Sequence, residues 1–419
     1  MEGVVGFHRS TGLFVLMLTL LIAACGEAPT PSVEAGSTVR DSAGIQVVES
    51  AAPVWKDESG WRLGDTPLLD IGRLDGPDET QFFRVIAGAR LSDGSLVLGS
   101  IGSHDLRRFT ADGEHLWTVG REGEGPGEFV GLMRLVASAG DTILTYDFRQ
   151  RRFSRFSPDG TFLDARPLEG PSEAGFAFVE SLLPDGTAVY TWRAFNRDEG
   201  PPSEGEIRRD TLSVQVLAAA GDTVYELGLF PGDETVVLQS GEVEGGFSIT
   251  ISSTAFGRST QITGGDSGIW VGDSERFEIR RYSLDGQLQA LVRRSSDPVV
   301  VDDALVERAM AEELEDADDD QRRQIRRRWE SSPLPPTLPA FEALHVDRTG
   351  NLWVQAFEVP GAPERTWSVF NADGAWLGDV VFPDRFRPLE IGDDYVLGRF
   401  GDDLDVEHVQ IWELVKPAG

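Results

Sequence analysis

The chain has 419 residues, and its 70 Asp and Glu against 38 Lys and Arg give a formal net charge of −32. A surface this acidic repels nucleic acid and anionic membrane faces and favours cations or cationic partners, so nucleic acid is excluded as a partner. Cys25 is the only cysteine. The chain therefore cannot form an intramolecular disulfide, and packing alone must hold its fold.

Residues 1–24 are predicted to be a signal peptide. Arg9 precedes an apolar run from Leu13 to Ala24, which is too short to span a bilayer and is typical of a signal-peptide core. The run ends in Ile22-Ala23-Ala24-Cys25, which resembles a bacterial lipobox. This resemblance implies that Cys25 becomes the first mature residue and carries a diacylglycerol. Ordinary cleavage after Ala24 is the alternative.

A lipidated Cys25 places the protein in the cell envelope, with the lipid anchor as its only membrane contact. In a Gram-negative source the outer membrane is favoured, because no Asp follows the cysteine. Residues 25–44 are rich in Pro, Ala, Ser and Gly and are predicted to be a flexible tether. Residues 45–417 are predicted to form one folded domain.

Two series of turns recur along this domain. The first series is a five-residue motif: an aromatic residue, a small polar residue, any residue and then Asp-Gly. It occurs at Phe109 to Gly113, Phe156 to Gly160, Tyr282 to Gly286 and Phe370 to Gly374. A second series lies upstream, at Ser92 to Gly94, Ala139 to Asp141, Pro184 to Gly186, Asp266 to Gly268, Arg348 to Gly350 and Ile391 to Asp393. Short segments of alternating polarity separate the turns, which indicates hairpins of four-stranded antiparallel sheets. Six such units predict an all-β, six-bladed β-propeller.

The sixth unit lacks a fourth strand before the chain ends. The phrase after Ile71, Gly72 to Pro77, is related to Gly120 to Pro126 after the first unit, yet no strands precede it to complete a blade. We therefore expect a strand near Leu68 to Ile71 to be the outer strand of blade six and to close the ring.

These motifs resemble the NHL-repeat-like six-bladed β-propellers. The resemblance rests on Asp93 to Leu98, the strand ending at Phe109, Asp112-Gly113 and the loop from Gly120 to Phe129, with weaker echoes over roughly residues 61–415. Members of this group are mostly interaction platforms, while related six-bladed rings include lactonases and a lyase. The resemblance therefore implies the fold and leaves the function open.

Three insertions are expected on the face opposite the Asp-Gly turns, at residues 194–209, 231–258 and 295–337. Insertions gathered on one side of a repeat protein often mark its binding side. The third has helical spacing of apolar residues from Leu305 to Leu314 and an arginine-rich segment ending at Trp329. It is predicted to be a helical insertion between blades four and five. Either it is a solvated helix pair, or the segment from Asp302 to Trp329 is a lid over the mouth of the ring.

Candidate ligand-binding side chains on this face are Arg149, Arg193, Arg276 and His104. Arginines could hold a carboxylate with two hydrogen bonds. Weaker candidates for binding a divalent cation such as calcium are Asp105, Asp147, Asp273 and His408. His115 and His345 are interpreted as packing residues. No sequence motif of a known catalytic site is present.

The sequence favours a monomeric, lipid-anchored binding protein that presents its insertion-bearing face to a protein, peptide or glycan. On this interpretation the protein is not an enzyme. The alternative is a metal-dependent hydrolase, lactonase or lyase on the same face, which requires several of the acidic and histidine candidates to converge on one point.

Overall fold

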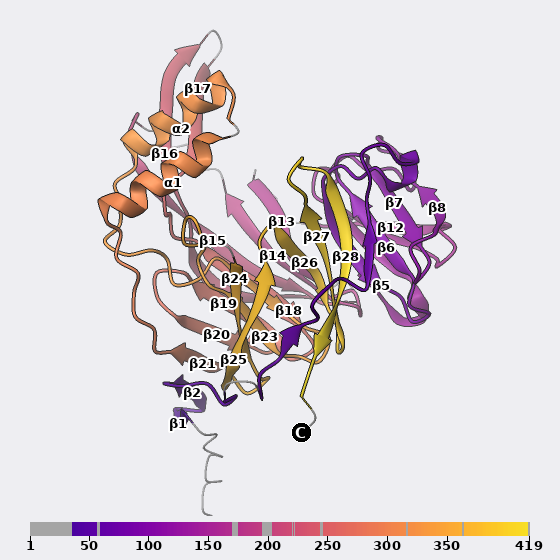
Figure 1. The fold of residues 1–419 in the computed structure, drawn as a ribbon, viewed down its shortest axis with the longest axis horizontal. Helices are drawn as coiled ribbons and strands as arrows, with labels where there is room; N and C mark the ends of the chain where they lie inside the picture. The colour runs from indigo at the N-terminus through magenta and orange to yellow at the C-terminus, as the bar shows by residue number, and fades with distance from the viewer. Residues whose placement is uncertain are drawn as a thin grey trace, which may run out of the picture. The chain divides into compact units, whose positions relative to one another are not determined.

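The computed structural model describes residues 36–417, apart from 57–58, 170–174, 195–202, 220, 222, 244–245, 316 and 363. The predicted signal peptide and Cys25 lie outside these residues. The described part is mostly β-structure, arranged in six sheets of mainly antiparallel strands, as in a β-propeller. We number the sheets one to six in the order in which residues 85–415 enter them, and the strand by which these residues enter a sheet is its first strand (Figure 1).

Sheets one and two have four strands each. Sheet one contains β5 (Val85–Arg90), β6 (Leu96–Ser100), β7 (Asp105–Phe109) and β8 (His115–Val119). Sheet two contains β9 (Leu132–Ala137), β10 (Ile143–Asp147), β11 (Arg152–Phe156) and β12 (Phe162–Pro167). A short 3-10 turn at Asp78–Thr80 precedes β5, and another at Ala139–Asp141 lies between β9 and β10.

Sheets three and four are larger than the predicted four-stranded units. Sheet three contains β13 (Gly175–Leu182), β14 (Ala188–Ala194), β15 (Ile207–Leu217), β16 (Val224–Val243) and β17 (Gly246–Ser253). Sheet four contains β18 (Thr260–Gly265), β19 (Gly268–Asp273), β20 (Glu278–Tyr282) and β21 (Leu288–Arg294), followed at its edge by β2 (Ile45–Ser50) and β1 (Ser37–Ser42). The insertion predicted at residues 231–258 is largely the extended end of β16 together with β17.

Sheet five contains β22 (Ala343–Val346), β23 (Leu352–Gln355), β24 (Glu364–Phe370) and β25 (Trp376–Pro383). Sheet six contains β26 (Phe386–Ile391), β27 (Tyr395–Gly401) and β28 (Glu407–Val415). Two short strands from the N-terminal side, β3 (Arg62–Leu63) and β4 (Leu69–Ile71), pair antiparallel with β28. The strand predicted near Leu68 to Ile71 is thus present beside the last strand of the chain.

The predicted Asp-Gly hairpin turns are confirmed. Strands β7, β11, β20 and β24 end at the aromatic residues of the motif, Phe109, Phe156, Tyr282 and Phe370, and all four side chains are buried. The glycines that follow, Gly113, Gly160, Gly286 and Gly374, have φ between 84° and 91°. This left-handed conformation is strained for other residues and explains why glycine stands at this point of each turn.

Part of the segment predicted as a tether, residues 25–44, is a strand in the structure, and residues 25–35 of it lie outside the described residues. Residues 37–42 form β1, which makes a hairpin with β2, and β2 pairs parallel with β21. Val47 and Val48 of β2 are 2% and 1% exposed. The sequence did not reveal this hairpin because its turn, Ala43-Gly44, lacks the Asp-Gly signature used to find the others.

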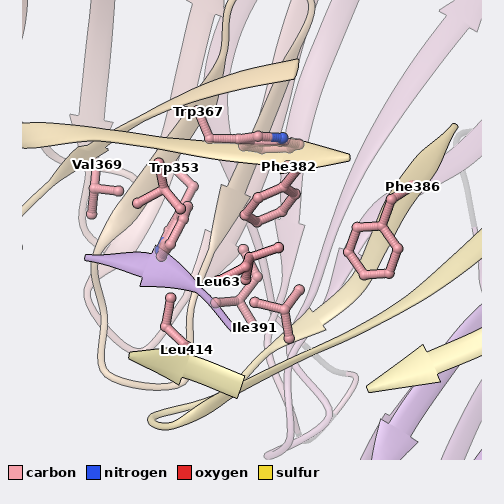
Figure 2. Close-up of a cluster of buried hydrophobic side chains, with 10 residues drawn as sticks. Leu63, Trp353, Trp367, Val369, Phe382, Phe386, Ile391 and Leu414 are labelled. Carbon is pink, nitrogen blue, oxygen red and sulfur yellow. The ribbon is translucent and has the colours of Figure 1, made fainter. Parts of the chain in front are cut away.

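Apolar clusters lie between successive sheets and hold them together. Figure 2 shows the cluster between sheets five and six, in which Leu63 of β3 lies among side chains of both sheets. Its neighbours are Trp353, Trp367, Val369, Phe382, Phe386, Ile391 and Leu414. Leu63 is 9% exposed and Trp353 is fully buried. The N-terminal segment therefore supplies part of the core of the last two sheets.

The third insertion contains two helices, as predicted. They are α1 (Asp303–Glu315) and α2 (Asp319–Ser331), the latter begun by a capping box at Asp318 and Gln321. α2 packs against β16, and α1 packs against α2 (Figure 1). Leu305 of α1 and Trp329 of α2 pack with Phe256, which follows β17, in an apolar cluster. This cluster contains no residue of the six first strands. Within the described part of the chain, no helix has the length and apolar character needed to cross a bilayer.

Candidate functional site

The first strands of all six sheets line one central cavity of about 720 Å³. These strands lie side by side: β5 contacts β9, β9 contacts β13, β13 contacts β18, β18 contacts β22, and β26 contacts β5. The Arg348 amide, after β22, donates to the Ile391 carbonyl of β26 at 3.0 Å. The volume is within the range of small-molecule sites. We call this cavity the channel.

The channel reaches the turns between the first and second strands. Ser92, Asp141, Pro184, Asp266 and Arg348, all from these turns, are among its lining residues. All residues of α1 and α2 are described by the structure, and none of them lines the channel. The helix pair therefore does not cover this cavity, and its apolar side packs on Phe256 instead. The lid prediction is not supported at the channel.

β-Bulges place one extra residue in four of the six first strands. The strand pairings skip Ile86 in β5, Met133 in β9, Glu180 in β13 and Leu389 in β26. Bulges redirect side chains and are common next to functional sites. Three of these residues are apolar and the fourth is Glu180. Sequence periodicity could not find them, because a bulge breaks the alternation on which strand prediction depends.

Arg134 of β9 and Glu180 of β13 form a charged pair that lines the channel. Arg134 Nε donates to the Glu180 carbonyl at 3.1 Å, and its Nη1 donates to the Met133 carbonyl at 3.1 Å. Its Nη2 lies 3.8 Å from Glu180 Oε2, which is longer than a hydrogen bond. Thr191 Oγ1 donates to Glu180 Oε1 at 2.8 Å. Arg134 Nη2 and Glu180 Oε2 are therefore not hydrogen-bonded to each other, and both residues line the channel.

Burial in the protein changes the pKa of both groups. It raises the pKa of the Glu180 carboxyl, an effect that the nearby Arg134 charge partly opposes. It lowers the pKa of the Arg134 guanidinium, which stays protonated because an arginine side chain does not lose its proton in proteins. Their side chains remain 31% and 30% accessible. The pKa shifts and the accessibility together show two charged groups that are largely surrounded by protein and partly open.

His345 of β22 also lines the channel, although the sequence suggested a packing role. Burial lowers its pKa to about 4, so its ring is neutral at neutral pH and offers one donor and one acceptor. Two residues later, Asp347 is 4% exposed. Its carboxylate accepts from the amides of Thr349 and Asn351 and from the Trp353 indole. Asp347 is thus a structural acceptor that fixes the turn.

A second charged network stands where the channel meets the turns. Glu390 accepts from the Arg90 amide at 3.0 Å and pairs with Arg348 Nη2 at 2.8 Å, and the Tyr395 hydroxyl also donates to it. The Arg90 guanidinium stacks 4.7 Å from the centre of the Tyr395 ring. Burial and the adjacent Glu390 raise the pKa of Tyr395. This network ties sheets one, five and six together at one end of the channel.

The structure places the four predicted ligand-binding residues outside the channel. Arg149 and Arg276 are exposed, and the Arg149 guanidinium lies 5.5 Å from the Phe148 ring centre. Arg193 pairs with Asp233 at 2.8 Å. His104 sits between β6 and β7 with φ +57°, and within the described part of the chain its Nδ1 is buried without a hydrogen-bond partner. The structure does not bring these groups together in one site.

The four weaker metal candidates all have protein partners. Asp105 pairs with Arg107 at 3.1 Å, Asp273 pairs with Arg209 at 2.8 Å, and His408 Nδ1 is 2.7 Å from Asp70. Asp147, 2% exposed, accepts from the amides of Val130, Gly131, Arg149 and Gln150. Over the described residues, no three His, Cys, Asp or Glu side chains group as a metal site would require.

Comparison with known proteins gives structural likenesses at low identity. No family model matches the chain, and no curated protein sequence matches it. A solved member of the DUF4221 family from Bacteroides vulgatus is 10% identical, covers 86% of this chain and 100% of its own, and has a TM-score of 0.48. A gluconolactonase from Xanthomonas campestris is 12% identical over 80% and 87%, with a TM-score of 0.39. Virginiamycin B lyase from Staphylococcus aureus is 12% identical over 85% and 100%, also with a TM-score of 0.39.

Proposed function

We propose that this chain is a lipid-anchored, six-bladed β-propeller of the cell envelope, similar to the NHL-repeat propellers, that binds a small polar ligand in its channel. The six sheets supply the blades, and the pairing of β3 and β4 with β28 supports closure between the two ends of the domain. Closure leaves no long unpaired edge in the last blade.

The observation that carries the binding function is the channel itself. All six first strands contribute to it, and it contains the charged side chains of Arg134 and Glu180. Binding sites are typically cavities with a few well-placed polar groups in largely apolar walls. The channel has the volume of such a site, and its lining mixes apolar residues with many polar and charged ones, which suits a polar ligand. None of the four ligand-binding candidates on the insertion-bearing face lines it, and Arg193 is already paired with Asp233. A protein or glycan site on that face stays a prediction.

The hydrolase, lactonase or lyase alternative remains secondary. It depends on convergence of side chains such as Asp105, Asp147 and His408, and in the described part of the chain these have separate partners. No specific observation of the channel favours a reaction over binding.

The proposed anchor is tested by Cys25→Ser. Without the only thiol, the protein cannot receive a diacylglycerol, and we expect it to move from the detergent phase to the aqueous phase in Triton X-114 partition. Mass spectrometry of the wild-type N-terminus should show the lipid. A wild-type protein with a free, unmodified Cys25 contradicts the anchor.

Channel occupancy is tested by labelling a thiol placed at position 86. In a Cys25→Ser background, Ile86→Cys gives one thiol at a channel-lining bulge where the native side chain is 38% exposed. The control is Leu229→Cys, on β16 outside the channel, where the native side chain is 73% exposed. We expect the low-molecular-mass fraction of an extract of the source cells to slow maleimide labelling at position 86 and not at 229. Equal rates with and without the fraction at both positions contradict a channel ligand.

A further inference from the structure

We propose that the channel recognises a zwitterion, an amino acid or short peptide, whose carboxylate binds Arg134 and whose ammonium binds Glu180. This inference rests on the proposed binding function and names its ligand class. It depends on three features of the channel: the charged residue at a bulge, the unused hydrogen-bonding capacity of the pair, and the charge and composition of the surroundings.

The fold does not require a charged residue at the β13 bulge. The equivalent bulges of β5, β9 and β26 carry Ile86, Met133 and Leu389, which are apolar. Placing Glu180 there costs desolvation, as its raised pKa shows, and burying a charge is unfavourable unless it is well paired. Two apolar residues in place of Arg134 and Glu180 would stabilise this position at least as well as the pair does. The carboxyl group is therefore better explained by recognition than by folding.

The pair presents a donor and an acceptor side by side. Arg134 is fixed by two bonds to backbone carbonyls, of Met133 and Glu180, and Thr191 fixes Glu180 through Oε1. The remaining atoms, Arg134 Nη2 and Glu180 Oε2, are 3.8 Å apart. A guanidinium suits a carboxylate, and a carboxylate suits an ammonium. A ligand with both groups would complete the hydrogen bonds of each side chain without leaving either charge unpaired.

The surroundings select against other ligand classes. A net charge of −32 repels a free anion over long range, whereas a zwitterion has no net charge to be repelled. A single cation would compete with Arg134 for the Glu180 carboxylate. Among the described lining residues there is no Phe, Tyr or Trp, and the His345 imidazole is the one aromatic ring, so the channel offers no large ring on which an aromatic ligand could stack.

The test measures binding of one dipeptide and its matched analogues by calorimetry. The probes are L-alanyl-L-alanine, its N-acetyl derivative, its C-terminal amide and glucose. We expect only the unmodified dipeptide to bind. Glu180→Met, which copies the residue at the β9 bulge, and Arg134→Met should each weaken binding about tenfold or more, because charge-assisted hydrogen bonds are lost. Arg149→Met, at an exposed arginine outside the channel, should bind as wild type does.

Each result supports or overturns the inference. Circular dichroism and thermal unfolding verify that the variants fold. If Arg134→Met does not fold, dipeptide binding is measured with Arg134→Lys, which keeps the charge. Equal binding of the N-acetyl derivative or the amide overturns the zwitterion, as does dipeptide binding unchanged in Glu180→Met. If no probe binds but the thiol at position 86 is still protected by the extract, the ligand class is wrong and the channel function stands. If neither occurs, both fail.

Discussion

Replacing residues 61–72 with a Gly-Ser linker of equal length should remove half or more of the free energy of unfolding, or abolish the cooperative transition. The segment carries β3 and β4, the outer partners of β28. It buries Leu63 and Ile71, which are 9% and 5% exposed. Loss of a buried Leu or Ile costs roughly 2–5 kcal/mol each, and a whole domain is stable by only about 5–15 kcal/mol. The proposed ring would also open at β28.

The matched control replaces residues 37–42, which form β1, in the same way. β1 is also an outermost strand, but it pairs only with β2 at the edge of sheet four. Most of its residues are not buried. Chemical denaturation followed by tryptophan fluorescence should show a much smaller loss for this control. A 61–72 replacement that unfolds as cooperatively, and at the same denaturant concentration, as the control contradicts closure by the N-terminal strands.

The turn chemistry made most of the fold predictable from sequence. An aromatic residue followed by Asp-Gly sets both a buried strand end and a turn in which glycine takes a positive φ, so the signature reports two physical requirements at once. This is why strands ending at Phe109, Phe156, Tyr282 and Phe370 could be located to the residue. The β1–β2 hairpin and the fifth strand of sheet three lack this signature, and both were missed.

The channel residues could not be predicted in the same way. Arg134 and Glu180 are 46 positions apart in the sequence and meet only because two sheets pack with a particular register, and a bulge sets Glu180 outside its strand pairing. His345 follows Leu344 in a short strand and was interpreted as a packing residue. Asp147 looked like a ligand because it ends a strand in a loop. Its carboxylate instead satisfies four backbone amides, which no sequence pattern distinguishes from metal binding.

Asp347→Ala should cost roughly 3 kcal/mol of unfolding free energy, although Asp347 belongs to no proposed ligand contact. Its carboxylate accepts from the amides of Thr349 and Asn351 at 2.9 Å each, and from the indole nitrogen of Trp353 at 2.9 Å. Trp353 is fully buried in the cluster of Figure 2. Its N–H would lose its partner there, and an unsatisfied buried donor costs about 1–3 kcal/mol. The turn that joins β22 to β23 would lose its two amide bonds as well.

Asp112→Ala provides the matched control, because Asp112 occupies an Asp-Gly turn of sheet one but is exposed. Exposed substitutions usually change stability by less than about 0.5 kcal/mol. Asp347→Asn should fall near the alanine variant, since an amide nitrogen placed at Oδ2 would face the N–H of Trp353 and the side-chain amide of Asn351. Urea denaturation of the three variants measures the difference. If Asp347→Ala and Asp112→Ala unfold at the same midpoint, the carboxylate does not hold the turn, and its burial at 4% exposure would then be better explained by a role in the channel that Asp347 lines.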